Sequence, residues 1–323
     1  MGLILLIDTL RSQLNDSKIN RELIQIQQFE NTFYELLNLH NRNIEAIEFY
    51  DVFGYQKKGK LFFDSKKEEL YNTFNASFSL SKNKRNAVSN FELIYNMHEE
   101  IFSTYFKTLY QLYKLIDKED IPNKYKVKYS KILRAQLSNS ELFFIRYNAL
   151  SEIGDESIPY LNKYNYLKHL SNFELLEFKK WWIKLDKFEK NGLGHIFKDL
   201  KYLLKNIIDD RNTDTLEKIF KQSKYKIIIK SKEKFELEIK IIINNNINPQ
   251  GKFLIDGLDK FSVKEIEILF KYVVREYLIY SNFNRFNVRR QLDIRSSING
   301  NEITIQIEQF LKKRINFYNK SFT

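Results

Sequence analysis

The stretch YSKILRAQLSNSELFFIRYNALSEIGD, residues 129–155, has the apolar content of a buried helix, yet it carries several polar side chains. If the stretch is one helix, with 100° of rotation per residue, apolar side chains cover most of its circumference. Arg134, Ser138, Glu141 and Asn148 then fall within about 80° of arc. Because a helix with two apolar sides is normally central in its bundle, the stretch predicts a helical bundle with a polar stripe on its central helix.

The polar stripe has three interpretations, which the sequence leaves open. It can be a buried network that fixes the register of neighbouring helices, since an unpaired buried charge is costly. It can instead line a cleft that binds a ligand. Ser138 and Glu141 also have the spacing of a capping box, so the helix can break at this point and begin again.

The composition excludes several classes of site. Nine Gly and three Pro in 323 residues favour long helices, and no glycine-rich phosphate-binding motif occurs. There is no Cys, which excludes disulfides, thiol nucleophiles and thiolate zinc sites and fits a cytoplasmic protein. None of the four His has another His three or four residues away, so we expect no metal site and no cofactor.

Helical periodicity dominates the first two thirds of the chain, and the basic, irregular segment 54–88 interrupts it. A short helix can start there at the capping box Ser65–Glu68, and the rest of the segment is an expected mobile surface excursion. Helices are predicted over residues 17–50, 89–117 and 129–155. A further helical run follows the capping box Ser171–Glu174 and is broken by NGLG (191–194), and two more helices are predicted over about 196–209 and about 214–222.

The pattern changes to period two near residue 225. YKIIIK (225–230) and FELEIKIII (235–243) predict one hairpin, and Asn299-Gly300 is a strong signal for another. A helix from Ser262 to about residue 283 lies between them, and a final helix is expected over 309–318. The predicted fold is therefore mainly α, with a helical bundle over 1–219 and a small α+β domain, ββαββα, over 220–323.

The positive charge is concentrated in the C-terminal domain. The net charge is +12, and residues 220–323 contribute +9 from 20 Lys and Arg against 11 Asp and Glu. This asymmetry favours an anionic partner such as nucleic acid, although a solvated basic face is the alternative. FNRFNVRR (283–290) and KKRINFYNK (312–320) mix cations with aromatics, and the candidate contacts are Arg285, Arg289, Arg290, Lys312, Lys313 and Arg314.

His40 lies on the apolar face of its predicted helix, where a histidine is usually part of the core. If it faces the polar stripe instead, it supplies a titrating group beside Arg134 or Glu141. These three residues are the candidate catalytic groups of a metal-independent ribonuclease. The chain lacks the Arg-x(4–6)-His spacing of HEPN ribonuclease toxins.

Several blocks together resemble the AbiC-like family of phage abortive infection proteins. The blocks are FENTFYELLNLHN (29–41), YFKTLYQLYKLID (105–117), the stretch 129–155 and YLNKYNYLKHL (160–170), with a weaker match at GKLFF (59–63). The resemblance covers about residues 29–170. It places His40 and the polar-stripe positions in family-like blocks without assigning their roles; the motif positions are Tyr105, Phe106, Arg134, Ser138, Glu141, Tyr147 and Asn148.

The resemblance implies antiphage defence in which the infected cell is disabled before the phage matures. We therefore expect an effector that binds a phage component or nucleic acid and arrests the host. The alternatives are a ribonuclease toxin and a non-catalytic scaffold subunit of a defence complex, and a homo-oligomer or a defence-complex partner is compatible with each. The apolar run GLILLI (2–7) is too short to span a bilayer, so membrane association is not expected.

Overall fold

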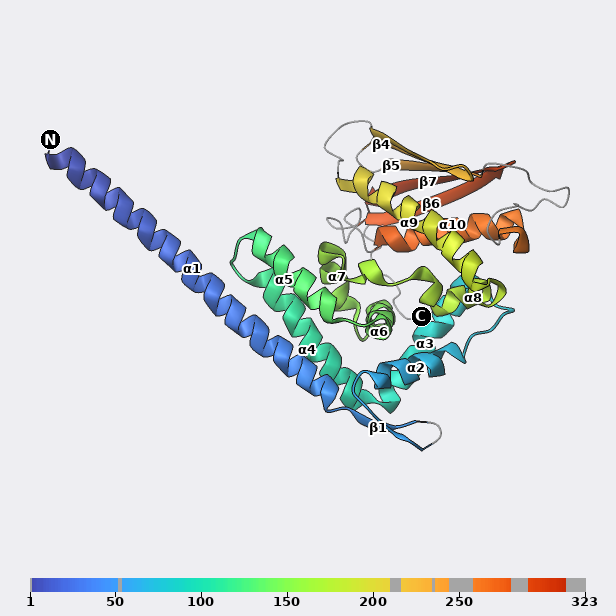
Figure 1. The fold of residues 1–323 in the computed structure, drawn as a ribbon, viewed down its shortest axis with the longest axis horizontal. Coiled ribbons are helices and arrows are strands. Elements are labelled where there is room, and N and C mark those ends of the chain that lie inside the picture. The colour runs from blue at the N-terminus through green and yellow to red at the C-terminus, as the bar shows by residue number, and fades with distance from the viewer. Residues whose placement is uncertain are drawn as a thin grey trace, which may run out of the picture. The chain divides into compact units, whose positions relative to one another are not determined.

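The computed structural model describes residues 2–51, 54–209, 216–233, 236–243, 258–279 and 290–311. The chain is mainly helical and carries an antiparallel sheet in its C-terminal part, which confirms the predicted class (Figure 1). It forms two compact units, Met1–Leu170 (unit 1) and Ser171–Thr323 (unit 2).

Unit 1 consists of α-helices, two short 3-10 helices and a small antiparallel hairpin. The elements are α1 (Gly2–Glu45), β1 (Glu48–Tyr50), β2 (Gln56–Lys58), α2 (Leu61–Tyr71), α3 (Leu80–Met97), α4 (Glu99–Lys118), α5 (Asn123–Gln136), α6 (Asn139–Leu150), η1 (Asp155–Ser157), α7 (Ile158–Tyr164) and η2 (Tyr166–His169).

The core of unit 1 is aromatic and surrounds α6. Every residue from Ser140 to Ala149 is buried, so α6 has no solvated face and is the central helix that the apolar pattern predicts. Phe102 of α4 and Phe63 of α2 both pack rings against Phe144 of α6, with centroid separations of 5.3 and 6.2 Å. Ring pairs at these distances add to the free energy gained by burying apolar area.

Only the second half of α1 is packed. Residues 7–25 are all exposed, whereas from Ile26 onward one face of the helix is buried through Phe29, Phe33 and Ile44, against α4. Figure 1 shows the N-terminal half of α1 extending beyond α4 and α5. Within the described part of the chain, no helix combines the length and apolar character that crossing a membrane requires.

The predicted surface excursion over 54–88 is wrong, and the short helix expected from Ser65 is present but begins at Leu61. The segment instead contains β2, the whole of α2 and the start of α3, and the Phe62 and Phe63 side chains are fully buried. The helix expected over 89–117 begins earlier, at Leu80, and is interrupted at His98, which separates α3 from α4. The burial of these two phenylalanines thus packs the segment into unit 1, although its average composition is polar.

Unit 2 consists of a five-stranded antiparallel sheet and helices. The elements are η3 (Asn172–Glu174), η4 (Leu176–Phe178), α8 (Lys179–Lys184), α9 (Lys187–Asp209), β3 (Leu216–Lys221), β4 (Tyr225–Glu233), β5 (Glu236–Ile243), η5 (Leu258–Lys260), α10 (Val263–Ile279), β6 (Arg290–Asn299) and β7 (Glu302–Leu311).

The sheet has the strand order β3-β4-β5-β7-β6, with every neighbouring pair antiparallel. α9 packs on β3 and β4 and α10 packs on β6, and both helices cover the same face of the sheet (Figure 1). Alternate residues such as Ile227, Ile239 and Ile305 are fully buried, as expected for strands with one covered face.

The predicted ββαββα order is not confirmed. Residues 216–221 were expected to be helical but form the edge strand β3, and residues 309–311, expected to begin a final helix, continue β7. The remainder of that helix, 312–318, lies outside the described residues. The hairpin at Asn299-Gly300 is confirmed, and Gly300 adopts φ +56°, a conformation that favours glycine.

The two compact units divide at 170/171, whereas the sequence placed a boundary at 219/220. The difference arises because α9 packs on the sheet, so the helices after residue 170 share the core of the strands that follow them. The expected break at NGLG (191–194) does not occur either, since this segment lies inside α9. An isolated Gly in a long amphipathic helix lowers its stability without ending it.

Candidate functional site

The stretch 129–155 is two helices, so the prediction of a single helix with one polar stripe is wrong. α5 ends at Gln136 and α6 begins at Asn139, with Leu137 and Ser138 extended between them. The Ser138 hydroxyl accepts the Glu141 N–H (3.2 Å), and the Glu141 carboxylate accepts the Ser138 N–H (2.8 Å). This reciprocal capping box agrees with the third interpretation of the polar stripe, in which the helix breaks at Ser138 and begins again. The break separates Arg134 from Glu141.

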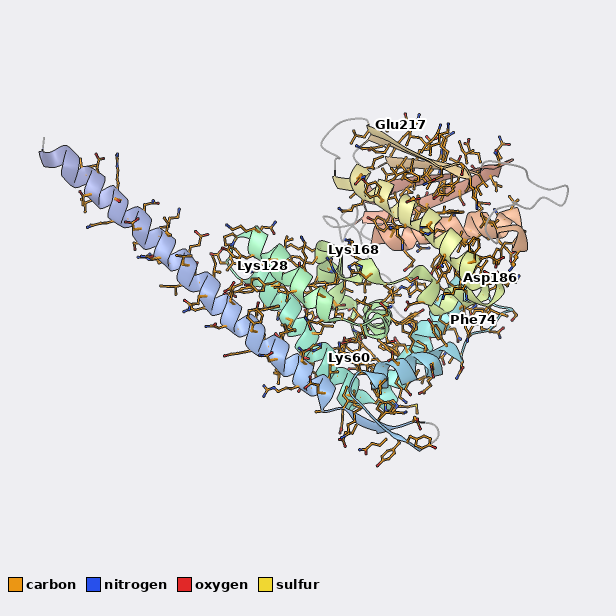
Figure 2. The ribbon with its side chains drawn as sticks, in the orientation of Figure 1. Lys60, Phe74, Lys128, Lys168, Asp186 and Glu217 are labelled. Carbon is orange, nitrogen blue, oxygen red and sulfur yellow. The ribbon has the colours of Figure 1, made fainter. Side chains whose placement is uncertain are left out.

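Glu141 is the centre of a buried polar cluster. Its side chain has no exposed surface, and besides the cap its oxygens accept a hydrogen bond from the Tyr105 hydroxyl (3.2 Å) and pair with Lys60 Nζ (3.0 Å). Lys60 lies in the turn between β2 and α2 and is half exposed (Figure 2). It also donates to the carbonyl of Gln136 at the end of α5, so one ammonium joins three segments.

His40 reaches the same cluster from α1. It is 1% exposed, its ring centroid lies 4.9 Å from that of Tyr105, and Nδ1 lies 2.8 Å from the Thr108 hydroxyl of α4. That hydroxyl can donate to the carbonyl of Tyr105 (3.0 Å), an arrangement that favours the Nδ1–H tautomer of His40. Within the described residues, Nε2 has no hydrogen-bond partner.

Burial sets the protonation of the cluster. Desolvation lowers the pKa of His40 to about 4, with a smaller opposing effect of the Glu141 charge. Burial, together with the same charge, raises the pKa of Tyr105 and of Tyr113 well above the ordinary value. At neutral pH the imidazole is therefore uncharged and both phenols are protonated, so Tyr105 is a hydrogen-bond donor to Glu141.

Arg134 makes its hydrogen bonds elsewhere. Its guanidinium donates to the carbonyls of Asn165 (3.1 Å) and Tyr164 (3.4 Å) at the C-terminal end of α7. Asn165 has φ +51°, the left-handed conformation that ends many helices. A cation at this position satisfies two terminal carbonyls and complements the helix dipole. The predicted grouping of Arg134 with His40 is therefore not observed.

The remaining motif positions have separate surroundings. Tyr147 packs its ring on Phe143 at 4.7 Å. Phe106 and Asn148 line a cavity of about 330 Å³ between α3, α4, α6 and the segment 151–157. The structure thus brings together His40, Tyr105 and Glu141, whereas Tyr147 makes an aromatic contact and Phe106 and Asn148 lie at a cavity wall.

Lys60 and Thr108 are the members of the cluster that the sequence did not predict. Lys60 is part of the family-like GKLFF block, so the resemblance marked its position but gave no role. Thr108 likewise lies in the family-like block 105–117 but was given no role, because its partner His40 lies 68 residues away in the sequence. Both contacts depend on how α1, α2 and α4 pack around α6.

The predicted nucleic-acid contacts lie almost entirely outside the described residues. This applies to Arg285, Arg289, Lys312, Lys313 and Arg314. Arg290 is the first residue of β6, and its backbone alone is described. In the described ranges, no group of three or more His, Asp or Glu side chains is placed to hold a metal ion.

Comparison with known families matches the central helices of unit 1. A family model described as "Putative phage abortive infection protein" matches residues 97–174, from the end of α3 through α4, α5, α6 and α7 to η3. The resemblance seen in the blocks 105–117, 129–155 and 160–170 is therefore confirmed over this segment. A search of curated proteins found no match.

Proposed function

We propose that this protein is a cytoplasmic effector of abortive infection, which binds a phage component or nucleic acid in the infected bacterium and arrests the host. The match of residues 97–174 to the abortive infection family carries the proposal. The matched segment contains α4 and α6, which supply Tyr105 and Glu141 to the buried cluster. The shared sequence thus coincides with the centre of unit 1.

The burial of the Glu141 cluster favours a binding effector over the ribonuclease alternative. A general acid or base must come within hydrogen-bond reach of its substrate. His40 is 1% exposed, Glu141 is fully buried with its carboxylate occupied by the cap, Tyr105 and Lys60, and Arg134 is bound to the end of α7. The cluster is better suited to fixing the positions of α1, α2, α4 and α6.

The experiment is a phage challenge of bacteria that express the chain alone. An abortive effector is expected to lower plaque formation and phage yield at every multiplicity, while infected cells die at high multiplicity and uninfected cells grow normally. Unchanged plaque formation at normal protein level would overturn the proposal. Protection only after co-expression of neighbouring genes would instead support the scaffold alternative.

The Glu141→Gln variant separates the binding and ribonuclease hypotheses in the same assay. Because the amide keeps the shape of the carboxylate, a structural Glu141 predicts a folded variant that still protects cells. A catalytic Glu141 predicts a folded variant that does not. The matched control is Glu45→Gln, which removes an exposed carboxylate at the end of α1.

The nucleic-acid part of the proposal is supported by the +9 charge of residues 220–323. If this region contacts phosphates, the affinity for single-stranded RNA or DNA falls steeply as salt rises, because counterions are released on binding. The measurement is fluorescence anisotropy of a labelled oligonucleotide at several salt concentrations. A variant with Lys312, Lys313 and Arg314 changed to Gln is expected to bind more weakly and with a shallower salt slope. Salt-independent binding of the oligonucleotide, or no binding, would remove nucleic acid as the partner.

A further inference from the structure

The cavity in unit 1 is separate from the polar cluster and has the character of a ligand site. It encloses about 330 Å³ and is bounded by α3, α4, α6 and the segment 151–157. This volume is at the lower end of the range for small-molecule sites in proteins. Apart from Tyr95, all the residues that line it lie inside the family-matched segment 97–174.

Aromatic rings form much of the cavity wall. Tyr95, Phe106, Tyr110 and Tyr113 all line it, and the rings of Tyr95 and Phe106 lie nearly parallel, with centroids 6.3 Å apart and planes inclined by 18°. Apolar side chains such as Ile145 complete the wall. A wall of this kind favours a flat, unsaturated ligand, since stacking on aromatic side chains contributes to the binding of planar heterocycles.

Two residues of the cavity wall carry buried polar atoms that the protein leaves unpaired. Within the described part of the chain, neither the Tyr113 hydroxyl nor Asn148 Oδ1 has a hydrogen-bond partner. Both belong to buried side chains, and an unpaired buried polar atom costs free energy. A ligand that offers both a donor and an acceptor along one edge can satisfy the two together.

Gly154 allows the segment 151–157 to close on Asn148. A Cβ atom at position 154 would lie 1.9 Å from Asn148 Nδ2 and 2.7 Å from the Asn148 carbonyl oxygen. Any larger residue would therefore displace the amide or the backbone of α6. The lack of a Cβ at position 154 leaves room for the Asn148 side chain at the cavity wall.

The charges at the cavity indicate the rest of the ligand. Glu156 accepts a hydrogen bond from the Tyr110 hydroxyl (3.0 Å), so this carboxylate has a partner within the wall. Lys107 lines the cavity with an exposed side chain and supplies a positive charge that suits a phosphate. These features together fit a ligand that places a flat polar base inside the cavity and an anionic group near Lys107.

We propose that this cavity binds one nucleotide unit, with the base among the aromatic rings, its polar edge on Tyr113 and Asn148, and its phosphate near Lys107. The unit can be a free nucleotide or a single base presented by a single-stranded nucleic acid, because both offer the same chemistry. The site is distinct from the basic C-terminal region, and the inference does not depend on that region binding nucleic acid.

The test is isothermal titration of the full chain with each ribonucleoside monophosphate, with adenosine, with ribose phosphate, and with a short single-stranded oligonucleotide. We expect binding of at least one monophosphate or of the oligonucleotide, with weaker binding of ribose phosphate, which lacks a base. Binding of a monophosphate identifies a free nucleotide as the ligand. Binding of the oligonucleotide alone identifies a base within a strand.

Two variants with matched controls place the binding in this cavity. Tyr113→Phe removes an unpaired hydroxyl, so the free protein is expected to melt at the same or a higher temperature while affinity falls about five- to tenfold. Tyr50→Phe, at an exposed position of β1, is its control. Lys107→Ala is expected to weaken the binding of the monophosphate more than the binding of adenosine. Lys131→Ala, an exposed change on α5, should leave both affinities unchanged.

Two results would overturn the inference. The first is the absence of binding by every base-containing probe at millimolar concentration. The second is binding whose affinity Tyr113→Phe and Lys107→Ala leave unchanged, because the probe would then occupy another site. Neither result bears on antiphage protection, so the phage challenge remains an independent test of the proposed function.

Discussion

Removing the Glu141 carboxylate should destabilise unit 1 strongly, because three separate groups depend on it. The Glu141→Ala change leaves the buried Tyr105 hydroxyl without its acceptor, at a cost of about 1–3 kcal/mol. It also removes half of the capping box at Ser138, worth about 1 kcal/mol. Lys60 is half exposed and can be solvated, so its ion pair contributes less than about 1 kcal/mol. The expected total is about 2–5 kcal/mol.

The assay is urea unfolding followed by circular dichroism at 222 nm, with tryptophan emission as an internal reference. Both tryptophans, Trp181 and Trp182, lie in unit 2, so their emission reports that unit. With a denaturant slope of about 2 kcal/mol per molar, the helical transition of Glu141→Ala should move down by about 1–2.5 M urea. The Glu141→Gln amide keeps one acceptor and should lose only about 1–2 kcal/mol.

A double-mutant cycle isolates the Tyr105 contribution to this loss. Because Tyr105→Phe removes the hydroxyl that Glu141→Ala would strand, the double variant should be more stable than the sum of the two changes predicts, by about 1 kcal/mol. The exposed change Glu45→Gln should stay within about 0.5 kcal/mol of the wild type. The reasoning is refuted if Glu141→Ala also stays within that margin, or if Glu141→Gln is as damaging as Glu141→Ala.

Three further predictions test other parts of the structure. Gly154→Ala should destabilise unit 1 by about 1–3 kcal/mol, because its methyl group would overlap α6. Gly194→Ala, inside α9 with open space around the new methyl group, should instead stabilise the protein by about 0.5–1 kcal/mol, and thermal melts check both changes. Burial lowers the pKa of His40 to about 4, below the value near 6.5 of the unfolded chain, so the unfolded state takes up the proton first. This contribution to stability is complete above pH 6.5 and is lost as the pH falls toward 4. His40→Gln should therefore make the urea midpoint less dependent on pH over that window. Phe63→Ala should cost about 3–5 kcal/mol in urea unfolding, whereas Leu61→Ala, at an exposed position of the same helix, should cost less than about 0.5 kcal/mol; equal effects would contradict the observed packing of α2.

The sequence identified α6 correctly as a buried central helix but misjudged where it begins. Ser138 and Glu141 have the capping spacing, and the same spacing at Ser262 and Glu265 also forms a cap in the structure. The predicted capping box Ser65–Glu68 lies inside α2, because that helix already begins at Leu61. The spacing alone is therefore ambiguous, and the extended backbone before the serine, which the sequence does not display, decides the outcome.

The candidate site was predictable only in part. His40, Tyr105 and Glu141 were marked by the family-like blocks, and the structure brings these three together. The sequence groups Arg134 with them only if one continuous helix spans 129–155, and the break at Ser138 removes that geometric reason. Thr108 depends on the register between α1 and α4, a tertiary contact that local periodicity does not encode.

The unpacked half of α1 has a consequence for thermal melting. Residues 7–25 bury no side chain, so their helicity depends on local propensity and on continuity with the packed half, which acts as a preformed nucleus. Such a segment loses helicity gradually from its unpacked end as temperature rises. The ellipticity of the protein should therefore decline steadily before the cooperative transition, and the slope of that baseline should disappear when residues 2–24 are deleted.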